Sequence, residues 1–221
     1  GPLRFYHDAT DNPDYNPDSK RHGNMMLRGV GTTLPIHDMR TFDPQTGSVL
    51  ESVEGAVIVS SAAEGHDENP YPQRNFALDG INLVGDTASC VMEVSGGIGS
   101  RFRNSVIFQR GASGDGLVMT AAWFFDAQHV KIFGTTGTSG TGLVAGTNYI
   151  FAGQYTLRNC MIDTWRDGVD WREGPFQNVH FLNSTFQRCT RDSIRASGGS
   201  IGDLVLTNCY FEGEARQHDI R

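Results

Sequence analysis

Three segments in the last third of the chain share one residue pattern and a nearly constant spacing. They read YTLRNCMID, VHFLNSTFQ and LVLTNCYFE, at positions 155–163, 179–187 and 204–212. In each segment an Asn is followed by Cys or Ser, and these Asn residues lie 24 and 25 positions apart: Asn159, Asn183 and Asn208. A repeat of this length is typical of a solenoid, in which each repeat forms one coil.

The same spacing continues toward the N-terminus along two tracks. Asp, Asn and Gly form turns at low cost, so each track predicts a turn that leads into a short strand. On the first track the place of the Asn-Cys pair is taken by Arg28-Gly29, Asp79-Gly80, Asn104-Ser105 and Phe133-Gly134. The second track contains Asp115-Gly116-Leu117, Thr141-Gly142-Leu143, Asp167-Gly168-Val169, Asp192-Ser193-Ile194 and Asp219-Ile220. A third strand of the coil is predicted at 56–60, 122–127 and 148–153.

Three short strands in a coil of about 25 residues predict an all-β fold, a right-handed single-stranded parallel β-helix. One coil cannot bury its apolar face alone, so stacking of coils about 4.8 Å apart builds the core. A leucine-rich repeat has a similar length, but it requires more leucines before its Asn than this chain has. No apolar stripe of helical period extends over three turns.

The chain divides into an irregular N-terminal segment, 1–23, and a β-helix domain, 24–221. The first segment is polar, and its Asp residues lack the Gly and Glu positions of an EF-hand loop, so no calcium site is predicted there. Because a further coil looks unfinished at Arg221, we expect the chain to be a fragment of a longer protein.

Charge and cysteine usage narrow the range of partners. The formal net charge of −7 argues against a nucleic-acid partner, which would favour a basic face. No run of 18 apolar residues occurs, so no membrane span is predicted. The cysteines lack the spacing of a metal site, and two coils, about 9.6 Å, separate Cys160 from Cys209. We therefore expect no disulfide and no metal site. No cofactor is predicted.

Alternation along the strands predicts which side chains face the core. The inward set is Val169, Trp171, Val179, Phe181, Ser184, Phe186, Ile194, Ala196, Leu204, Leu206, Cys209 and Phe211. The outward set is Arg158, Met161, Asp163, Asp170, Arg172, Leu182, Thr185, Gln187, Thr207, Tyr210 and Glu212. Arg195 lies beside Asp170 in this register, and a cross-strand ion pair between them is predicted.

The repeated motif resembles the pectate-lyase-like β-helices of bacteriophage tailspikes. LTNCYFEGE (206–214) and MMLRGVGTT (25–33) carry the closest likeness, which covers about residues 24–221. The resemblance implies a full-length homotrimer in the virion tail, acting outside the cell at the bacterial surface. It also implies that this protein binds and cuts bacterial surface polysaccharide, either capsule or O-antigen.

An outward column of Asp163, Gln187 and Glu212 is the predicted hydrolytic site. Asp163 and Glu212 lie two coils apart, so their carboxyl groups would be about 9 Å apart. That separation suits an inverting glycoside hydrolase, which places a water molecule between two acids. The alternative is that these residues belong to an ordinary solvated wall of the β-helix.

Within this column the two acids take different roles. Glu212 is predicted as the general acid, because the aromatic residues Tyr210 and Phe211 next to it favour a protonated carboxyl. Asp163 is predicted as the general base, and Glu173, on a turn, is held as a reserve acid.

Substrate contacts are predicted at Trp165 and Tyr210, whose rings could stack on sugars, and at Arg188. Either Arg188 or Arg166 would also keep Asp163 ionised.

Three functions stay open from the sequence. The first is a polysaccharide depolymerase, a hydrolase rather than a lyase, because a lyase needs a base beside a cation and no such outward cluster is clear. The second is a receptor-binding spike without catalysis. The third is a structural shaft that holds a trimer together.

Overall fold

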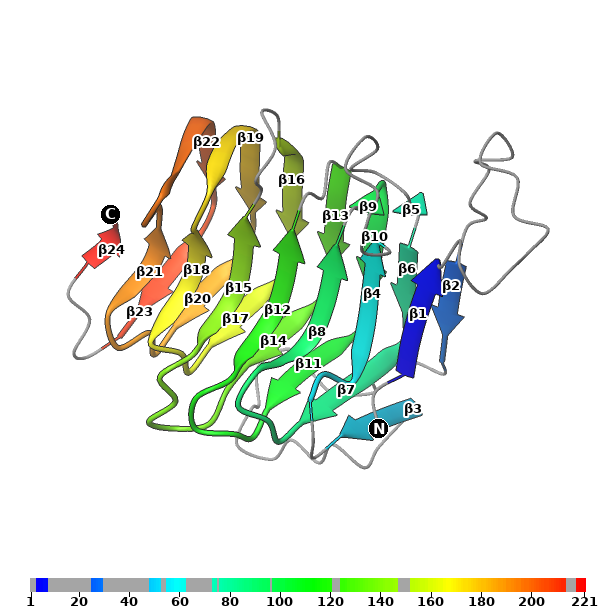
Figure 1. Cartoon of the computed structure of the whole chain (residues 1–221). Helices are drawn as coiled ribbons and strands as arrows, with labels where there is room; N and C mark the ends of the chain where they lie inside the picture. The colour runs from blue at the N-terminus through cyan, green and yellow to red at the C-terminus, as the bar shows by residue number, and fades with distance from the viewer. Residues whose placement is uncertain are drawn as a thin grey trace.

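The computed structural model describes residues 3–7, 25–29, 48–52, 55–62, 73–74, 76–95, 97–120, 124–146, 152–213 and 218–221. Within these ranges the regular elements are all β-strands and no helix occurs. Figure 1 shows the strands stacked side by side along one axis, with the N-terminal coils at one end and the C-terminal coils at the other. The predicted all-β solenoid is thus confirmed.

Three parallel sheets run the length of the solenoid. Sheet A contains β1 (Leu3–His7), β4 (Ile58–Ala62), β8 (Cys90–Ser95), β12 (Asp115–Thr120), β15 (Thr141–Gly146), β18 (Asp167–Trp171), β21 (Asp192–Arg195) and β24 (His218–Ile220). Sheet B contains β2 (Met25–Arg28), β6 (Phe76–Asp79), β10 (Ser100–Arg103), β13 (Phe124–Gln128), β16 (Ala152–Arg158), β19 (Gly174–Leu182) and β22 (Gly199–Thr207). Sheet C contains β3 (Ser48–Ser52), β7 (Ile81–Gly85), β11 (Val106–Gln109), β14 (Lys131–Phe133), β17 (Met161–Asp163), β20 (Thr185–Gln187) and β23 (Tyr210–Glu212). A short pair, β5 (Gln73–Arg74) and β9 (Gly97–Ile98), forms a separate two-stranded sheet.

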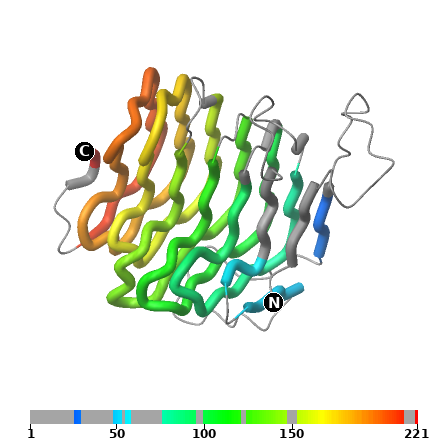
Figure 2. Tube along the Cα trace, viewed as in Figure 1, coloured from blue at the N-terminus to red at the C-terminus, as the bar shows by residue number. Residues whose placement is uncertain are grey.

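Each coil passes through sheet B, then sheet C and then sheet A, as the tube in Figure 2 shows for successive turns. The register confirms the coil length, because Asp163 pairs with Gln187 and Gln187 pairs with Glu212, 24 and 25 residues further on. The second track is confirmed too: Thr141 pairs with Asp167 and Asp167 pairs with Asp192 in sheet A.

The corner between sheets B and C explains the repeated Asn. Asn104, Asn159, Asn183 and Asn208 all have a left-handed backbone, with φ between 48° and 52°. Each of the first three donates its backbone N–H to the last carbonyl of the sheet-B strand in the next coil, for example from Asn183 to Thr207 O at 2.8 Å. The side chains add a ladder, in which Asn208 Nδ2 donates to Asn183 Oδ1 at 3.0 Å. Asn is the non-glycine residue that tolerates this backbone at low cost, so it recurs once per coil.

The structure corrects the first track at three coils. Gly80, with φ of 67°, occupies the Asn position itself, one residue later than predicted, and Gly29 pairs in the same way. In the glycine-rich coil the corner residue is His129, with φ of 53°, and not Phe133. The pattern of Asn and Gly does not include His129, because the corner requires a residue with positive φ. His adopts positive φ more readily than most residues.

This corner gives a testable prediction. Asn183→Ala is expected to lower the free energy of unfolding by about 1–2 kcal/mol, because Ala has no side-chain contact to offset the left-handed backbone. His129→Asn, which restores the majority residue at the same backbone geometry, is expected to leave stability unchanged or to raise it. Urea unfolding monitored by circular dichroism measures both, and a loss for His129→Asn as large as that for Asn183→Ala would contradict this account.

The core confirms most of the predicted inward set. Val169, Trp171, Val179, Phe181, Ser184, Phe186 and Ile194 are buried, and Leu204, Leu206, Cys209 and Phe211 pack partly buried against them. Under sheet B an aromatic ladder crosses five coils with ring centroids 5.1–6.0 Å apart, formed by Phe76, Phe102, Phe125, Tyr155 and Phe176. Such edge-to-face pairs add to the stabilisation from burial.

Cys160 and Cys209 lie on the same track as Ser184, as predicted. All four cysteines are free, and the Cys160 N–H donates to Ser184 Oγ at 3.3 Å, so Cys160 and Ser184 share one stack. Burial raises the pKa of the Cys160 thiol to about 12, which keeps it protonated and unreactive.

Several sequence predictions were wrong in detail. Met161, Asp163 and Asp170 were predicted outward, and all three are buried. Ala196 was predicted inward and is exposed, because the strand ends at Arg195. The segment 56–60 was predicted as the third strand of its coil, together with 122–127 and 148–153. Its strand, β4, lies instead in sheet A, the sheet that contains the strands of the second track.

The N-terminal segment contributes at least one strand. Leu3–His7 was included in the predicted irregular segment 1–23, yet it forms β1 and pairs in parallel with β4. The remainder of 1–23 lies outside the described residues. Within the described ranges, no helix is long and apolar enough to cross a membrane.

Candidate functional site

The predicted column exists in the backbone, but its two acids lie in opposite environments. Asp163, Gln187 and Glu212 end three adjacent strands of sheet C in register. Glu212 is exposed and its Oε2 accepts a hydrogen bond from Gln187 Nε2 at 2.8 Å. Asp163, in contrast, has no exposed surface.

Arg188 covers the Asp163 carboxylate. Its Nε donates to Oδ1 at 2.7 Å, and its terminal nitrogen donates to Oδ2. Thr164 Oγ1 donates to Oδ1 as well, at 2.9 Å. The hydrogen bond to Asp163 raises the pKa of Arg188 above its already high ordinary value. The pair is a bidentate salt bridge, and a base role for Asp163 would require Arg188 to move away.

Arg188 is positioned by its own backbone. It has φ of 49° and follows β20, and its N–H donates to Glu212 O at 2.8 Å. The alternative partner predicted for Asp163, Arg166, binds Asp167 instead, at 3.0 Å. Arg188, and not Arg166, is therefore the partner of Asp163, and its guanidinium is engaged with that carboxylate.

Trp165 cannot stack on a sugar in this structure, so that prediction was wrong. The indole is completely buried, and its Nε1 donates to Ile132 O at 3.1 Å. Two glycines of the second track leave room for the indole ring. A Cβ atom at Gly116 or at Gly142 would lie only 3.0 Å from an atom of the Trp165 side chain. The glycines predicted to serve turns thus also make room for the largest side chain of the core.

The remaining predicted site residues are separated. Tyr210 is 56% exposed and lies two positions from Glu212 on β23, so these two are brought together. Glu173 is exposed on the turn between β18 and β19, which joins sheet A to sheet B. Since Asp163 and Glu212 end strands of sheet C, Glu173 is not part of their column.

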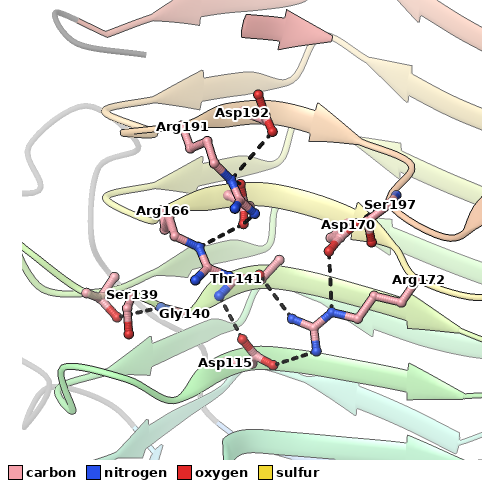
Figure 3. Close-up of polar contacts among 12 residues, drawn as sticks. Asp115, Ser139, Gly140, Thr141, Arg166, Asp170, Arg172, Arg191, Asp192 and Ser197 are labelled. Atoms are coloured by element: carbon pink, nitrogen blue, oxygen red, sulfur yellow. Dashed lines mark hydrogen bonds and ion pairs between the residues drawn. The ribbon is translucent and has the colours of Figure 1, made fainter. Parts of the chain in front are cut away.

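A second group of charged residues lies along sheet A (Figure 3). Asp167 is completely buried and is bound by Arg191, whose Nε donates to Oδ1 at 2.7 Å, and by Arg166. Arg191 also lies 3.6 Å from the carboxylate of Asp192, which is in register with Asp167. Asp167 and Asp192 are thus each preceded in the chain by an arginine that lies beside the carboxylate. Such a partner is what a buried charge requires.

Arg172 connects the acids on the other side of this group (Figure 3). Its guanidinium lies 3.4 Å from both Asp115 and Asp170, and it donates to Thr141 Oγ1 at 3.3 Å. Asp170 also accepts the Ser197 N–H at 3.2 Å. The predicted ion pair of Asp170 with Arg195 is therefore replaced by one with Arg172.

These contacts make the sheet-A group a structural network. Its carboxylates are matched by arginines, and no set of three or more His, Cys, Asp or Glu residues within the described ranges could hold a metal ion.

Asp115 gives a pH-dependent prediction. Burial raises the pKa of its carboxyl above the ordinary value of 3.8, and the Thr141 N–H and Arg172 offset only part of this. Because the folded-state pKa is the higher one, stability from this group is present at low pH and is lost as pH rises from about 3.8 through the folded value. Asp115→Asn, which keeps the acceptor for Thr141, should remove this dependence and gain less than about 1 kcal/mol at neutral pH.

Thermal unfolding of wild type and Asp115→Asn across acidic and neutral pH checks this expectation. Asp86→Asn, at an exposed position, is the matched control and should follow the wild type. Parallel stability curves for wild type and Asp115→Asn would contradict it.

A third region, on the outer face of sheet B, was missed by the sequence reasoning. A shallow depression of about 340 Å³ crosses β10, β13 and β16, lined among others by Arg101, Arg103, Phe124, Asp126, Gln154 and Arg158. Its charged residues come from different coils: Arg103 lies 23 positions before Asp126, and Arg158 lies 32 positions after it. The signal available in the sequence was the alternation of SRFR, FFDAQ and AGQYTLR, whose outward residues are polar apart from Phe124.

Charges in the depression are only partly matched. Asp126 is bound by Arg103 and by Arg158, the latter at 2.9 Å. Arg103 also donates to Gln128 Oε1, which fixes it on the strand face. Phe124 is 49% exposed beside these polar groups.

Comparison with protein-family models, with curated proteins and with solved structures finds no match for this chain.

Proposed function

We propose that this chain is the β-helix part of a bacteriophage tailspike, and that it binds bacterial surface polysaccharide, capsule or O-antigen. The observation that carries the proposal is the depression on sheet B, where an exposed aromatic ring lies among arginine, amide and hydroxyl groups. A sugar presents one apolar ring face and many hydroxyl groups, which such a surface can stack on and hydrogen-bond.

The shape of the sheet face supports an extended polymer as ligand. β10, β13 and β16 are parallel neighbours, so their outward side chains repeat at the spacing of the coils. A polysaccharide is itself a repeating chain, and a ladder of like positions can contact several of its units. In this proposal the full-length protein is a homotrimer in the virion tail.

Binding without cleavage is the function that the geometry favours. Asp163 is held by Arg188, Asp126 by two arginines, and the sheet-A acids by Arg166, Arg172 and Arg191. Hydrolysis is kept as the second candidate for one reason: Glu212 is exposed in the column with Asp163, beside the exposed Tyr210.

A paired assay separates these candidates. The full chain is incubated with purified capsule and O-antigen preparations, and binding is measured by calorimetry while new reducing ends are counted. Binding without reducing ends supports the receptor-binding function. If reducing ends form, Glu212→Gln should lower turnover by about a hundredfold or more, whereas the control Glu173→Gln should not.

The absence of binding to every preparation would refute the proposed function. Sedimentation that shows a stable monomer of the full-length parent protein would refute the tailspike assignment.

A further inference from the structure

Arg101 lines the sheet-B depression on β10, and its charge is not neutralised. It is exposed, and within the part of the chain that the structure describes its side chain makes no hydrogen bond or ion pair. Its register neighbour across the strands is an acid, Asp126, yet that carboxylate is bound by Arg103 and Arg158. The residue that could neutralise Arg101 is therefore already occupied.

The depression is a cationic area on an acidic protein. Arg101, Arg103 and Arg158 bring three positive charges, and Asp126 brings one negative charge, which leaves a local excess of two. The chain as a whole carries a formal net charge of −7. A positive area on a protein of negative net charge attracts anionic ligands. It does not weaken the stacking and hydrogen bonds that the depression can offer to uncharged groups of a ligand.

Phe124 lies close enough to share a ligand with Arg101. It precedes Asp126 by two positions on the same face of β13, and Asp126 is directly across from Arg101. Strand spacings place the two Cα atoms about 8 Å apart. One sugar ring stacked on Phe124 could thus direct a ring carboxylate toward the Arg101 guanidinium.

We infer that the depression selects an acidic polysaccharide, with Arg101 binding the carboxylate of a uronic acid whose ring, or the next one, stacks on Phe124. The inference rests on the proposed function and adds the substrate class. A guanidinium binds a carboxylate through two parallel hydrogen bonds, which neither a hydroxyl nor a hydroxymethyl group can replace.

The test compares two forms of one polymer. Oligosaccharides from a uronate-containing capsule, and the same oligosaccharides with their carboxylates reduced to primary alcohols, are titrated into the full chain by calorimetry. Wild type is expected to bind the acidic form about tenfold or more tightly, and less so at high salt. Arg101→Gln should reduce this preference to less than about twofold.

Two further variants identify the cause. Phe124→Ala should weaken both forms by a similar factor and keep the preference, because stacking does not depend on the carboxylate. Arg195→Gln is the control, since Arg195 lies on sheet A, makes no ion pair in the described ranges and is expected to change nothing.

The outcomes are distinct. Equal binding of both forms by wild type, or an unchanged preference in Arg101→Gln, would overturn the inference and leave the proposed function standing. If neither the acidic capsule nor neutral O-antigen binds, the proposed function fails, and the inference fails with it.

Discussion

Phe186→Ala is expected to lower the free energy of unfolding by about 3–5 kcal/mol, as truncation of a fully buried aromatic residue does. Phe186 has no exposed surface and lies between two other rings of the core. It stacks on Phe211 at 5.0 Å and meets Phe181 edge to face at 5.1 Å. The truncation leaves a cavity in the core. The hydrogen bonds of the sheets fix the neighbouring coils in place, so these coils cannot move together to fill the cavity.

The neighbouring residue supplies the control. Thr185→Ala removes an outward, half-buried side chain from the same strand and is expected to cost less than about 1 kcal/mol. Urea unfolding of both variants measures the difference. Equal losses at the two positions would show that the inward and outward assignment of β20 is wrong.

The fold could be predicted from the sequence because each coil repeats the same physical requirements. A corner between sheets B and C needs a left-handed residue, and Asn159, Asn183 and Asn208 reveal it through their spacing. Alternation then fixes the inward residues of the strands that follow. The Asn repeat does not predict the corner at His129. The corner is defined by its left-handed backbone, which more than one residue type can adopt.

The site was less predictable, because exposure depends on side chains from other coils. Alternation puts Asp163 on the outer face of its strand, but Arg188, 25 residues later, lies over it. Trp165 follows a strand end, where alternation no longer holds, and it enters space left by Gly116 and Gly142. In each case the deciding contact comes from a residue that the local pattern does not include.

The depression on sheet B was missed for a related reason. Arg101, Phe124 and Arg158 belong to three different coils, and none of them is unusual in its own segment. They form a site only when the register aligns β10, β13 and β16. The repeated Asn marks the corner and the sheet-C strands that follow it, whereas these residues lie in the sheet-B strands before the corner.

Removing the cation from the Asp163–Arg188 pair is the second change with a large expected effect. Arg188→Asn should lower the free energy of unfolding by about 2–3 kcal/mol, because the Asp163 carboxylate, which is buried under Arg188 in the wild type, keeps the Thr164 hydroxyl as its remaining side-chain donor. The value lies below that of a fully buried pair, since the Arg188 side chain is 53% exposed. Asn is chosen because it tolerates the left-handed backbone at this position, so the loss reports the charge and not backbone strain.

Two comparisons decide whether the buried charge is the cause. Arg191→Ala removes a similar arginine from Asp167, but Arg166 stays bound to that carboxylate, so the loss should be clearly smaller. Adding Asp163→Asn to Arg188→Asn removes the buried charge and should recover part of the stability. If the double variant is no more stable than Arg188→Asn, the arginine contributes through packing over β17 and β20, and the Asp163 carboxylate is not the reason that Arg188 stabilises this corner.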